Sequence, residues 1–134
     1  MKGGDLIARK GYGHQNNREV GTLYEHRAAE YLKKEGYELI CCNFRCRLGE
    51  IDLIAREGDT LVFVEVKYRS RTEYGAPSDA VNHKKQERIS NAASYYVYKN
   101  FGNTPVSCRF DVISIQNNEI TLYRNAFSYA GKYS

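Results

Sequence analysis

The chain has 134 residues, which is near the usual size of one domain and leaves no length for separate substrate and cofactor lobes. With 42% hydrophobic and 13% aromatic residues it can bury a core, so a wholly disordered chain is excluded. The formal net charge of +4 would favour a polyanionic partner without identifying one.

Membrane and secretory segments are not expected. The unbroken apolar run 61–64 is stopped by Glu65, whereas a membrane-spanning helix needs roughly 20 apolar residues. No apolar segment follows Met1 and Lys2, so we expect no secretory signal and a cytoplasmic protein. In that reducing compartment free thiols are expected, although a zinc site with His26 or His83 is an alternative. The cysteines, which form no C-x-x-C pair, are Cys41, Cys42, Cys46 and Cys108.

The first part of the chain predicts an arm, a helix and a strand. Residues 1–17 contain four glycines and several basic residues without an apolar period, so we interpret them as a mobile basic arm before a single domain over 18–134. Apolar residues at helical spacing predict a helix over 18–35, and Gly36 suits the left-handed position that ends it. Residues 37–44 are typical of a buried strand.

The remainder predicts a hairpin, a second helix and a second strand pair. Strands over 50–56 and 61–69 are joined at Gly58 and Asp59, a pair suited to a two-residue turn. Ser78 is expected to cap a helix that runs to about Lys99 with a core-facing apolar stripe. Strands over 107–115 and 119–124 follow, and 125–134 is interpreted as a short helix or coil.

The order favours an α/β layered fold, in which one central sheet is covered by helices and the second helix provides the crossover for a parallel strand. The stripe consists of Val81, Ile89, Ala92, Ala93, Tyr96 and Val97.

The hairpin brings charged residues together. Its turn makes Asp52 face Glu65, and Glu50 face Lys67, and the period of two places all four on one face. Like charges directly across a ladder are destabilising. The fold must therefore raise the pKa of one of the two acids, pair an acid with Lys67 in a salt bridge, or hold a cation between the two carboxylates. Hard oxygen ligands at this separation suit Mg²⁺ or Mn²⁺. The opposite, apolar face would consist of Ile51, Leu53, Ala55, Val62, Val64 and Val66.

Two helical residues add to this cluster. Glu25 shares a helix face with small residues and is expected to point inward, and Lys85 lies on the apolar stripe between Val81 and Ile89. A lysine there could stabilise a phosphate or pair with a carboxylate. Ordinary explanations remain open for each residue: a solvated charge ladder for the strands, a surface position for Glu25, and a side chain that extends from the edge of the stripe to water for Lys85. Their convergence from three elements favours a site.

The same residues carry a resemblance. Asp52 followed by Glu65-Val66-Lys67 is similar to the PD-(D/E)xK nuclease signature, with Ile51 in place of the proline. From about Gly21 to Phe127 the chain resembles the bacterial YraN family. The wider match consists of Gly21-x-x-x-Glu25, Asn43-x-Arg45, Gly49-Glu50-Ile51-Asp52-Leu53-Ile54, Val62-Phe63-Val64-Glu65-Val66-Lys67, Tyr74-Gly75, Lys85-Gln86 and Arg109-Phe110-Asp111-Val112.

This resemblance implies a restriction-endonuclease-like three-layer fold with a central mixed sheet flanked by helices, similar to archaeal Holliday junction resolvases. It implies that Glu25, Asp52 and Glu65 bind Mg²⁺ or Mn²⁺, and that Lys67 is catalytic, with Lys85 in a motif on the following helix. We therefore expect Asp52, Glu65, Lys67 and Lys85 to be the catalytic residues.

The expected function is metal-dependent hydrolysis of phosphodiester bonds in DNA, including branched DNA. Cutting two strands symmetrically would favour a homodimer. The alternatives are a nucleic-acid-binding module that does not cut, and a protein-interaction unit whose ionic face is structural. Phosphate contacts are expected from Arg45, Arg47, Arg69, Arg71, Lys84 and Arg88.

Overall fold

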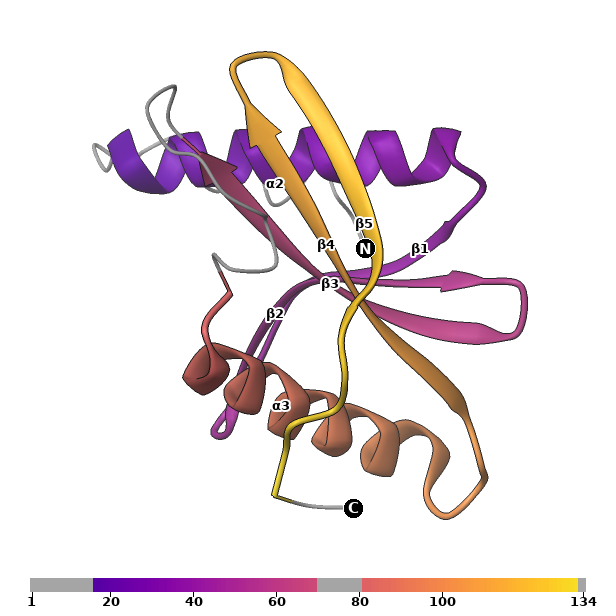
Figure 1. The fold of residues 1–134 in the computed structure, drawn as a ribbon. Coiled ribbons are helices and arrows are strands. Elements are labelled where there is room, and N and C mark those ends of the chain that lie inside the picture. Colours follow the sequence, from indigo (N-terminus) through magenta and orange to yellow (C-terminus); the bar gives the residue numbers. More distant parts are fainter. Residues whose placement is uncertain (1–15, 70–80, 133–134) are drawn as a thin grey trace.

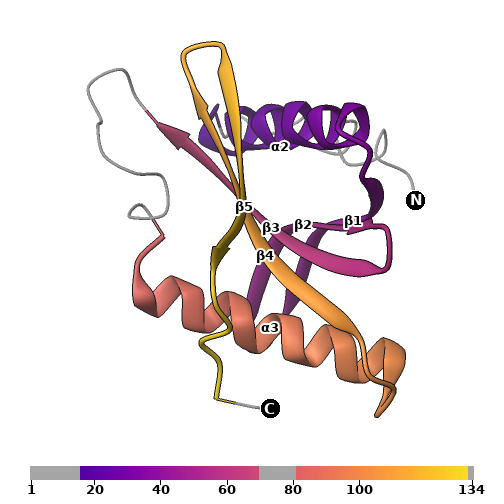
Figure 2. The same ribbon diagram turned by 45° about the vertical axis from the view of Figure 1, so that its right-hand side comes forward.

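The computed structural model describes residues 16–69 and 81–132, with side chains from Thr22 onward in the first of these ranges. Two helices enclose a five-stranded sheet between them as three layers (Figures 1 and 2). The expected α/β, three-layer arrangement is therefore confirmed. Within the described ranges, neither helix has the length and apolar character needed to cross a membrane. In chain order the elements are α2 (Asn16–Lys34), β1 (Glu38–Cys46), β2 (Gly49–Glu57), β3 (Thr60–Arg69), α3 (His83–Phe101), β4 (Ser107–Gln116) and β5 (Glu119–Phe127).

The sheet is mixed, as expected. Its strands are ordered β1-β2-β3-β4-β5, and β3 pairs with β4 in parallel while every other pair is antiparallel. The parallel pair requires a crossover, and α3 lies in that connection on the sheet face opposite α2 (Figure 2). Both faces of the sheet are therefore covered by a helix.

Helix α2 follows the predicted range closely. Ala28 and Leu32 are fully buried one turn apart, as the helical spacing of the apolar residues predicts. The helix ends before Gly36, whose φ of +94° is the left-handed conformation that glycine adopts at little cost. Of the predicted basic arm, residues 1–15 lie outside the described part, whereas Asn16 and Asn17 already belong to α2.

The hairpin register is as predicted near the turn. Leu53 pairs with Val64 and Glu57 pairs with Thr60, and Gly58 has a φ of +59° in the two-residue turn between them. The expectation of one apolar and one ionic face is wrong, because helices cover both faces. Leu53 and Val64 pack under α2, whereas Ile51 and Phe63 pack under α3.

Helix α3 begins later than predicted. Asn82 is its N-cap, and the Oδ1 atom of Asn82 accepts a hydrogen bond from the Lys85 backbone N–H at 2.8 Å. The predicted cap, Ser78, lies outside the described residues. The apolar stripe is as expected, because Val81, Ile89 and Ala92 are buried against the sheet.

The last strand is longer than expected. Strand β5 extends to Phe127, so the interpretation of 125–134 as helix or coil is wrong for its first residues. After it, the chain runs along α3: the Ala130 N–H donates to Ser90 Oγ at 3.0 Å, and the Lys132 N–H donates to Asn91 Oδ1 at 2.8 Å. This C-terminal segment thus covers one side of α3.

Candidate metal and catalytic site

The candidate site lies where β2 and β3 separate. Their ladder ends at the pair Leu53 and Val64, although β2 continues beside β1 to Gly49, and β3 continues beside β4 to Arg69. Figure 1 shows the two strands leaving each other, with the start of β2 near α3. The divergence opens a fork, and the first residues beyond the last pair are Asp52 and Glu65.

Asp52 spans this fork with its side chain. Its Oδ2 atom accepts a hydrogen bond from the Val66 backbone N–H at 2.8 Å. In a continued ladder the Val66 N–H would donate to the β2 backbone. Here it donates to the Asp52 carboxyl group instead. This contact keeps the Asp52 carboxyl group against β3, next to Glu65.

The two acids interact strongly. Burial, and then the negative charge of Glu65, raise the pKa of Asp52 to about 8, while the Val66 N–H and the charge of Lys85 act in the opposite direction. Asp52 therefore retains a proton near neutral pH when no cation other than Lys85 is close. The repulsion expected from the sequence is present, and it is relieved in part by protonation.

Lys85 reaches the same place from α3. Its Nζ atom lies 2.8 Å from Glu65 Oε2, and the Glu65 side chain is 6% exposed while that of Lys85 is 53% exposed. Partial burial opposes the charge of Lys85, but the charge of Glu65 and its hydrogen bond outweigh this effect and raise the pKa of Lys85. The expectation that Lys85 points toward the sheet is confirmed.

Lys67 follows Glu65 by two residues on β3 and lies on the same face of the sheet. It is partly buried and pairs through its backbone with Ser114 of β4. The expected pairing of Glu50 with Lys67 is wrong, because the ladder ends before it. Glu50 instead forms an ion pair with Arg45 of β1, with 3.2 Å between Nε and Oε1.

Glu25 does not complete a three-carboxylate cluster. Within the described ranges, no three His, Cys, Asp or Glu side chains lie close enough together to hold one ion. Glu25 belongs to α2, on the opposite side of the sheet from α3, and its charge acts on Cys42 of β1: burial first, then Cys41 and Glu25, raise the pKa of that thiol. The donor set is therefore the pair Asp52 and Glu65.

Four of the predicted phosphate contacts are exposed on neighbouring elements. Arg45 and Arg47 lie at the end of β1 and in the turn to β2, and Lys84 and Arg88 lie in the first half of α3. The turn packs closely on the helix, because a Cβ atom added at Gly49 would lie 2.7 Å from the Arg88 backbone oxygen.

The other two residues predicted to contact phosphate do not join this exposed group. Arg69 is only 7% exposed in β3, which does not fit a surface contact with phosphate. Arg71 lies outside the described residues.

The cysteines are free, as expected. Burial raises the pKa of Cys41, Cys42 and Cys108. Thiols with raised pKa values are poor nucleophiles at neutral pH.

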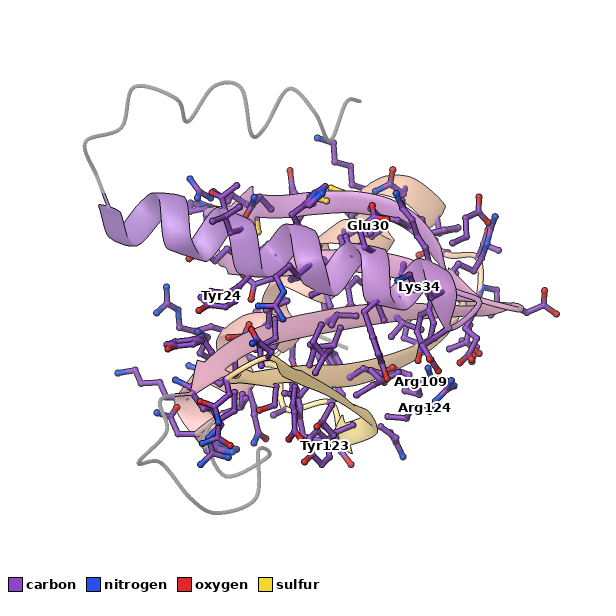
Figure 3. All side chains as sticks on the ribbon, turned by 90° about the horizontal axis from the view of Figure 1, so that it is seen from above. Tyr24, Glu30, Lys34, Arg109, Tyr123 and Arg124 are labelled. Carbon is purple, nitrogen blue, oxygen red and sulfur yellow. The ribbon has the colours of Figure 1, made fainter. Side chains whose placement is uncertain are left out.

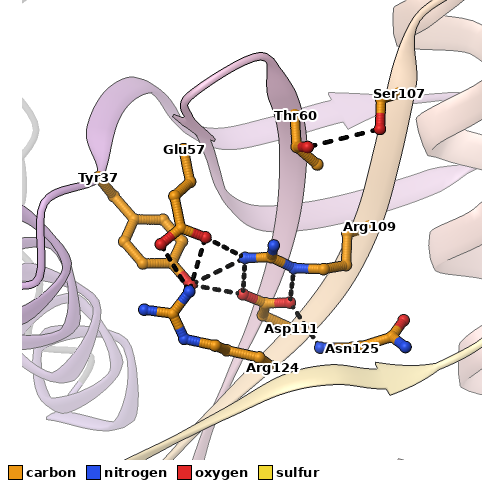
Figure 4. Close-up of polar contacts among 8 residues, drawn as sticks. All are labelled: Tyr37, Glu57, Thr60, Ser107, Arg109, Asp111, Arg124 and Asn125. Carbon is orange, nitrogen blue, oxygen red and sulfur yellow. Dashed lines mark hydrogen bonds and ion pairs between the residues drawn. The ribbon is translucent and has the colours of Figure 1, made fainter.

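A second polar cluster, which the sequence did not predict, joins several strands on the α2 side of the sheet (Figure 4). Asp111 is fully buried, and its carboxylate accepts hydrogen bonds from Tyr37 Oη at 2.8 Å, from Arg109 Nε at 2.8 Å and from the Asn125 N–H at 2.9 Å. The sequence signal was the pair Arg109 and Asp111 two residues apart, which a strand places on one face.

Two further residues extend this cluster. Glu57 accepts hydrogen bonds from Arg124 Nη1 at 2.6 Å and from Arg109 Nη2 at 2.8 Å, and these two arginines lower the pKa of Glu57. Figure 3 shows Arg109 and Arg124 close together near the Lys34 end of α2, whereas Tyr24 lies toward the other end. Asp111 pairs with Val64, close to the fork, but its side chain lies with Tyr37 on the α2 side of the sheet, whereas Glu65 contacts Lys85 of α3. The cluster and the candidate site therefore lie on opposite faces of the sheet.

Comparison with known proteins finds a family model whose matched range covers the candidate site. A model of the "Uncharacterised protein family UPF0102" matches residues 24–115, which include Asp52, Glu65, Lys67 and Lys85. A UPF0102 protein of Lachnoclostridium phytofermentans is 47% identical over 116 residues, covering 87% of this chain and 98% of that protein. Another, from Caldicellulosiruptor saccharolyticus, is 44% identical over 118 residues, covering 84% and 99%. A third, from Symbiobacterium thermophilum, is 48% identical over 100 residues, covering 75% and 84%.

Proposed function

The chain belongs to the uncharacterised protein family UPF0102, and we propose that it is a metal-dependent endonuclease that hydrolyses phosphodiester bonds of DNA. The observation that carries this proposal is the fork between β2 and β3. There, the carboxyl groups of Asp52 and Glu65 lie together, with Lys85 bonded to Glu65 at 2.8 Å. Paired carboxylates beside lysines suit the hydrolysis of a phosphate ester.

The donor set fits a hard divalent cation. Both groups offer oxygen ligands, which Mg²⁺ and Mn²⁺ prefer, and Mg²⁺ is commonly bound through one or two carboxylates plus water and phosphate. Burial and the charge of Glu65 raise the pKa of Asp52, and a bound cation would favour the ionised form of this group. When bound, such an ion would lower the pKa of a water molecule and neutralise charge on the phosphate.

Each residue of the site has a proposed task. Asp52, held against β3 by the Val66 N–H, and Glu65 would hold the ion. Lys67, on the same face as Glu65, would orient the attacking water and stabilise the negative charge that grows on the phosphoryl oxygens. Lys85 would transfer its contact from Glu65 to a phosphate oxygen of the substrate.

The substrate would be held through its phosphates by Arg45, Arg47, Lys84 and Arg88, which are exposed beside the fork. Because one site cuts one strand at a time, cleavage of both strands of a branched substrate would need two copies. A homodimer on the DNA belongs to the same proposal.

The test is cleavage of labelled branched, flapped and linear DNA by the purified protein in Mg²⁺ or Mn²⁺. We expect cleavage that EDTA abolishes, and a loss of about 100-fold or more in Asp52→Asn and in Lys67→Ala. Lys34→Ala is the matched control, because Lys34 is exposed at the end of α2 on the opposite side of the sheet.

Two outcomes would contradict the proposal. Cleavage that survives both substitutions would come from another site or from a contaminant. A wild-type protein that binds DNA in EDTA yet forms no product with any divalent ion would instead support the non-catalytic binding module.

A further inference from the structure

The outward side of α3 carries basic and aromatic residues in one line. Lys84, Arg88, Tyr95 and Lys99 are separated by four, seven and four positions, a spacing that keeps them on one face of a helix. All four are exposed, and Tyr95 is 39% exposed. At 1.5 Å per residue this line is about 22 Å long.

The elements beside α3 extend this surface. On one side Gly49, the first residue of β2, lies close to the Arg88 backbone, and Arg47 precedes it by two residues in the exposed turn from β1. The ring of Phe44 in β1 lies 6.3 Å from the ring of Tyr95. We call this surface the α3 strip. It consists of Arg45, Arg47, Lys84, Arg88, Tyr95 and Lys99.

The α3 strip carries five basic residues and one aromatic residue. The only acidic residue of α3 is Glu87, which lies toward the C-terminal segment and pairs with Lys132 at 3.4 Å. Arg45 is partly neutralised by Glu50. The strip therefore complements a polyanion better than it complements a neutral protein surface.

The ring of Tyr95 is more exposed than that of its neighbour. Tyr96 packs edge-on against Phe44 and Phe63, with ring centroids 5.3 Å and 6.0 Å away. Tyr95 contacts Phe44 at the edge of this packing and remains 39% exposed, and the Lys99 ammonium lies 6.0 Å from its ring centroid. An exposed aromatic ring flanked by cations is the arrangement that binds an unpaired base together with its phosphates.

We infer that the α3 strip binds single-stranded DNA and leads it to the fork between β2 and β3. The strip reaches the fork because Lys84 precedes Lys85, which contacts Glu65. A single strand fits better than a duplex, since a duplex hides the faces of its bases inside the stack, where Tyr95 could not reach them. This inference rests on the proposed nuclease function for the role of the strip, although binding itself requires no cleavage.

Binding is measured by fluorescence anisotropy in EDTA with the Asp52→Asn variant, so that cleavage cannot contribute. The probes are a labelled single-stranded DNA of about 20 nucleotides, the blunt duplex of the same sequence, and the matching RNA. We expect the single-stranded DNA to bind most tightly. Adding Tyr95→Ala should weaken its binding about tenfold, whereas Tyr95→Phe, which keeps the ring, should bind as before.

Charge is tested separately. Arg88→Ala or Lys99→Ala should weaken binding and reduce the slope of log affinity against log salt by about one, because each removes one phosphate contact. Lys34→Ala on α2 should change neither the affinity nor its dependence on salt. Equal or tighter binding of the duplex or the RNA, or full binding by Tyr95→Ala, would overturn the inference.

The two proposals can fail independently. If Tyr95-dependent binding of single strands is found but the wild-type protein never cuts, the proposed nuclease function is wrong and the inference about the α3 strip is supported. If the wild-type protein cuts DNA but Tyr95→Ala binds and cuts as well as wild type, the inference about the α3 strip is wrong and the proposed nuclease function is supported.

Discussion

Asp52 determines how the two acids of the fork meet, because its carboxylate is held by the Val66 N–H rather than left free at the end of a strand. The sequence predicted that Asp52, Glu65 and Lys85 approach one another, since strand and helix periods are local properties of the chain. The predicted convergence of Glu25 with Asp52 and Glu65 is not found among the described residues. Where Glu25 lies depends on the placement of α2 over the sheet, which local periods do not specify.

The pKa of Asp52 predicts how stability depends on pH in the absence of metal. In the unfolded chain this group ionises near pH 4, whereas burial and Glu65 raise its pKa to about 8 in the folded protein. Between these values the unfolded state binds fewer protons, so this group lowers the free energy of unfolding as pH rises.

We therefore expect Asp52→Asn, which does not titrate, to gain stability relative to wild type between pH 5 and pH 8, by up to about 1 kcal/mol per pH unit. Urea unfolding in EDTA at several pH values measures the difference. A difference that is constant with pH, or that runs in the opposite direction, would contradict the assigned environment of Asp52.

Lys85 and a divalent ion should compete for Glu65. Replacing Lys85 by Met leaves the buried carboxylate without its cation, and we expect a loss of about 1–2 kcal/mol in the free energy of unfolding without metal. Because the ion would supply the missing charge, Mn²⁺ should raise the melting temperature of Lys85→Met more than that of wild type.

Lys84→Met is the matched control for this comparison, since Lys84 is adjacent in sequence but exposed on the outward side of α3. Its response to Mn²⁺ should equal that of wild type. If Mn²⁺ stabilises Lys85→Met no more than wild type, Glu65 is not a ligand.

At the scale of elements, the turn at Gly58 and Asp59 was enough to predict the register of the hairpin, because a two-residue turn determines which residues face each other. The end of the ladder could not be predicted in this way. Strand β2 stays with β1 and β3 stays with β4 beyond Leu53, and these partners come from distant parts of the chain. The fork is therefore a property of the whole sheet.

The start of α3 sets where Lys85 lies, and it depends on the cap at Asn82. Asn82→Ala should lower the free energy of unfolding by about 1 kcal/mol, because the Lys85 N–H loses its acceptor. Asn82→Asp keeps an acceptor and places a negative charge at the positive end of the helix, so it should be at least as stable as wild type. Equal losses in the two variants would show that the hydrogen bond is not responsible.

At the scale of the whole molecule, the sheet separates a polar cluster that supports the fold from the fork proposed for chemistry. The cluster joins β2, β4 and β5 with Tyr37, which precedes β1, so it ties together segments from both halves of the chain. The motif Arg109-Phe110-Asp111-Val112 is thereby explained by folding rather than by catalysis. Only the assembled sheet brings Glu57 and Arg124 to it, which is why sequence reasoning missed the cluster.

Asp111→Asn should be among the most damaging single substitutions in this protein. It removes the negative charge of a fully buried group that faces Arg109, and we expect the free energy of unfolding to fall by about 3 kcal/mol. Arg56→Ala, which breaks the exposed ion pair with Glu38, should leave it nearly unchanged. Urea unfolding at pH 7 measures both, with Arg109→Lys as a milder variant if Asp111→Asn does not fold. Because the cluster lies on the opposite face of the sheet from the fork, the rise in melting temperature caused by Mn²⁺ should be the same in the folded cluster variant as in wild type. A reduced response to Mn²⁺ would mean that the two faces of the sheet are coupled and that the cluster also serves the site.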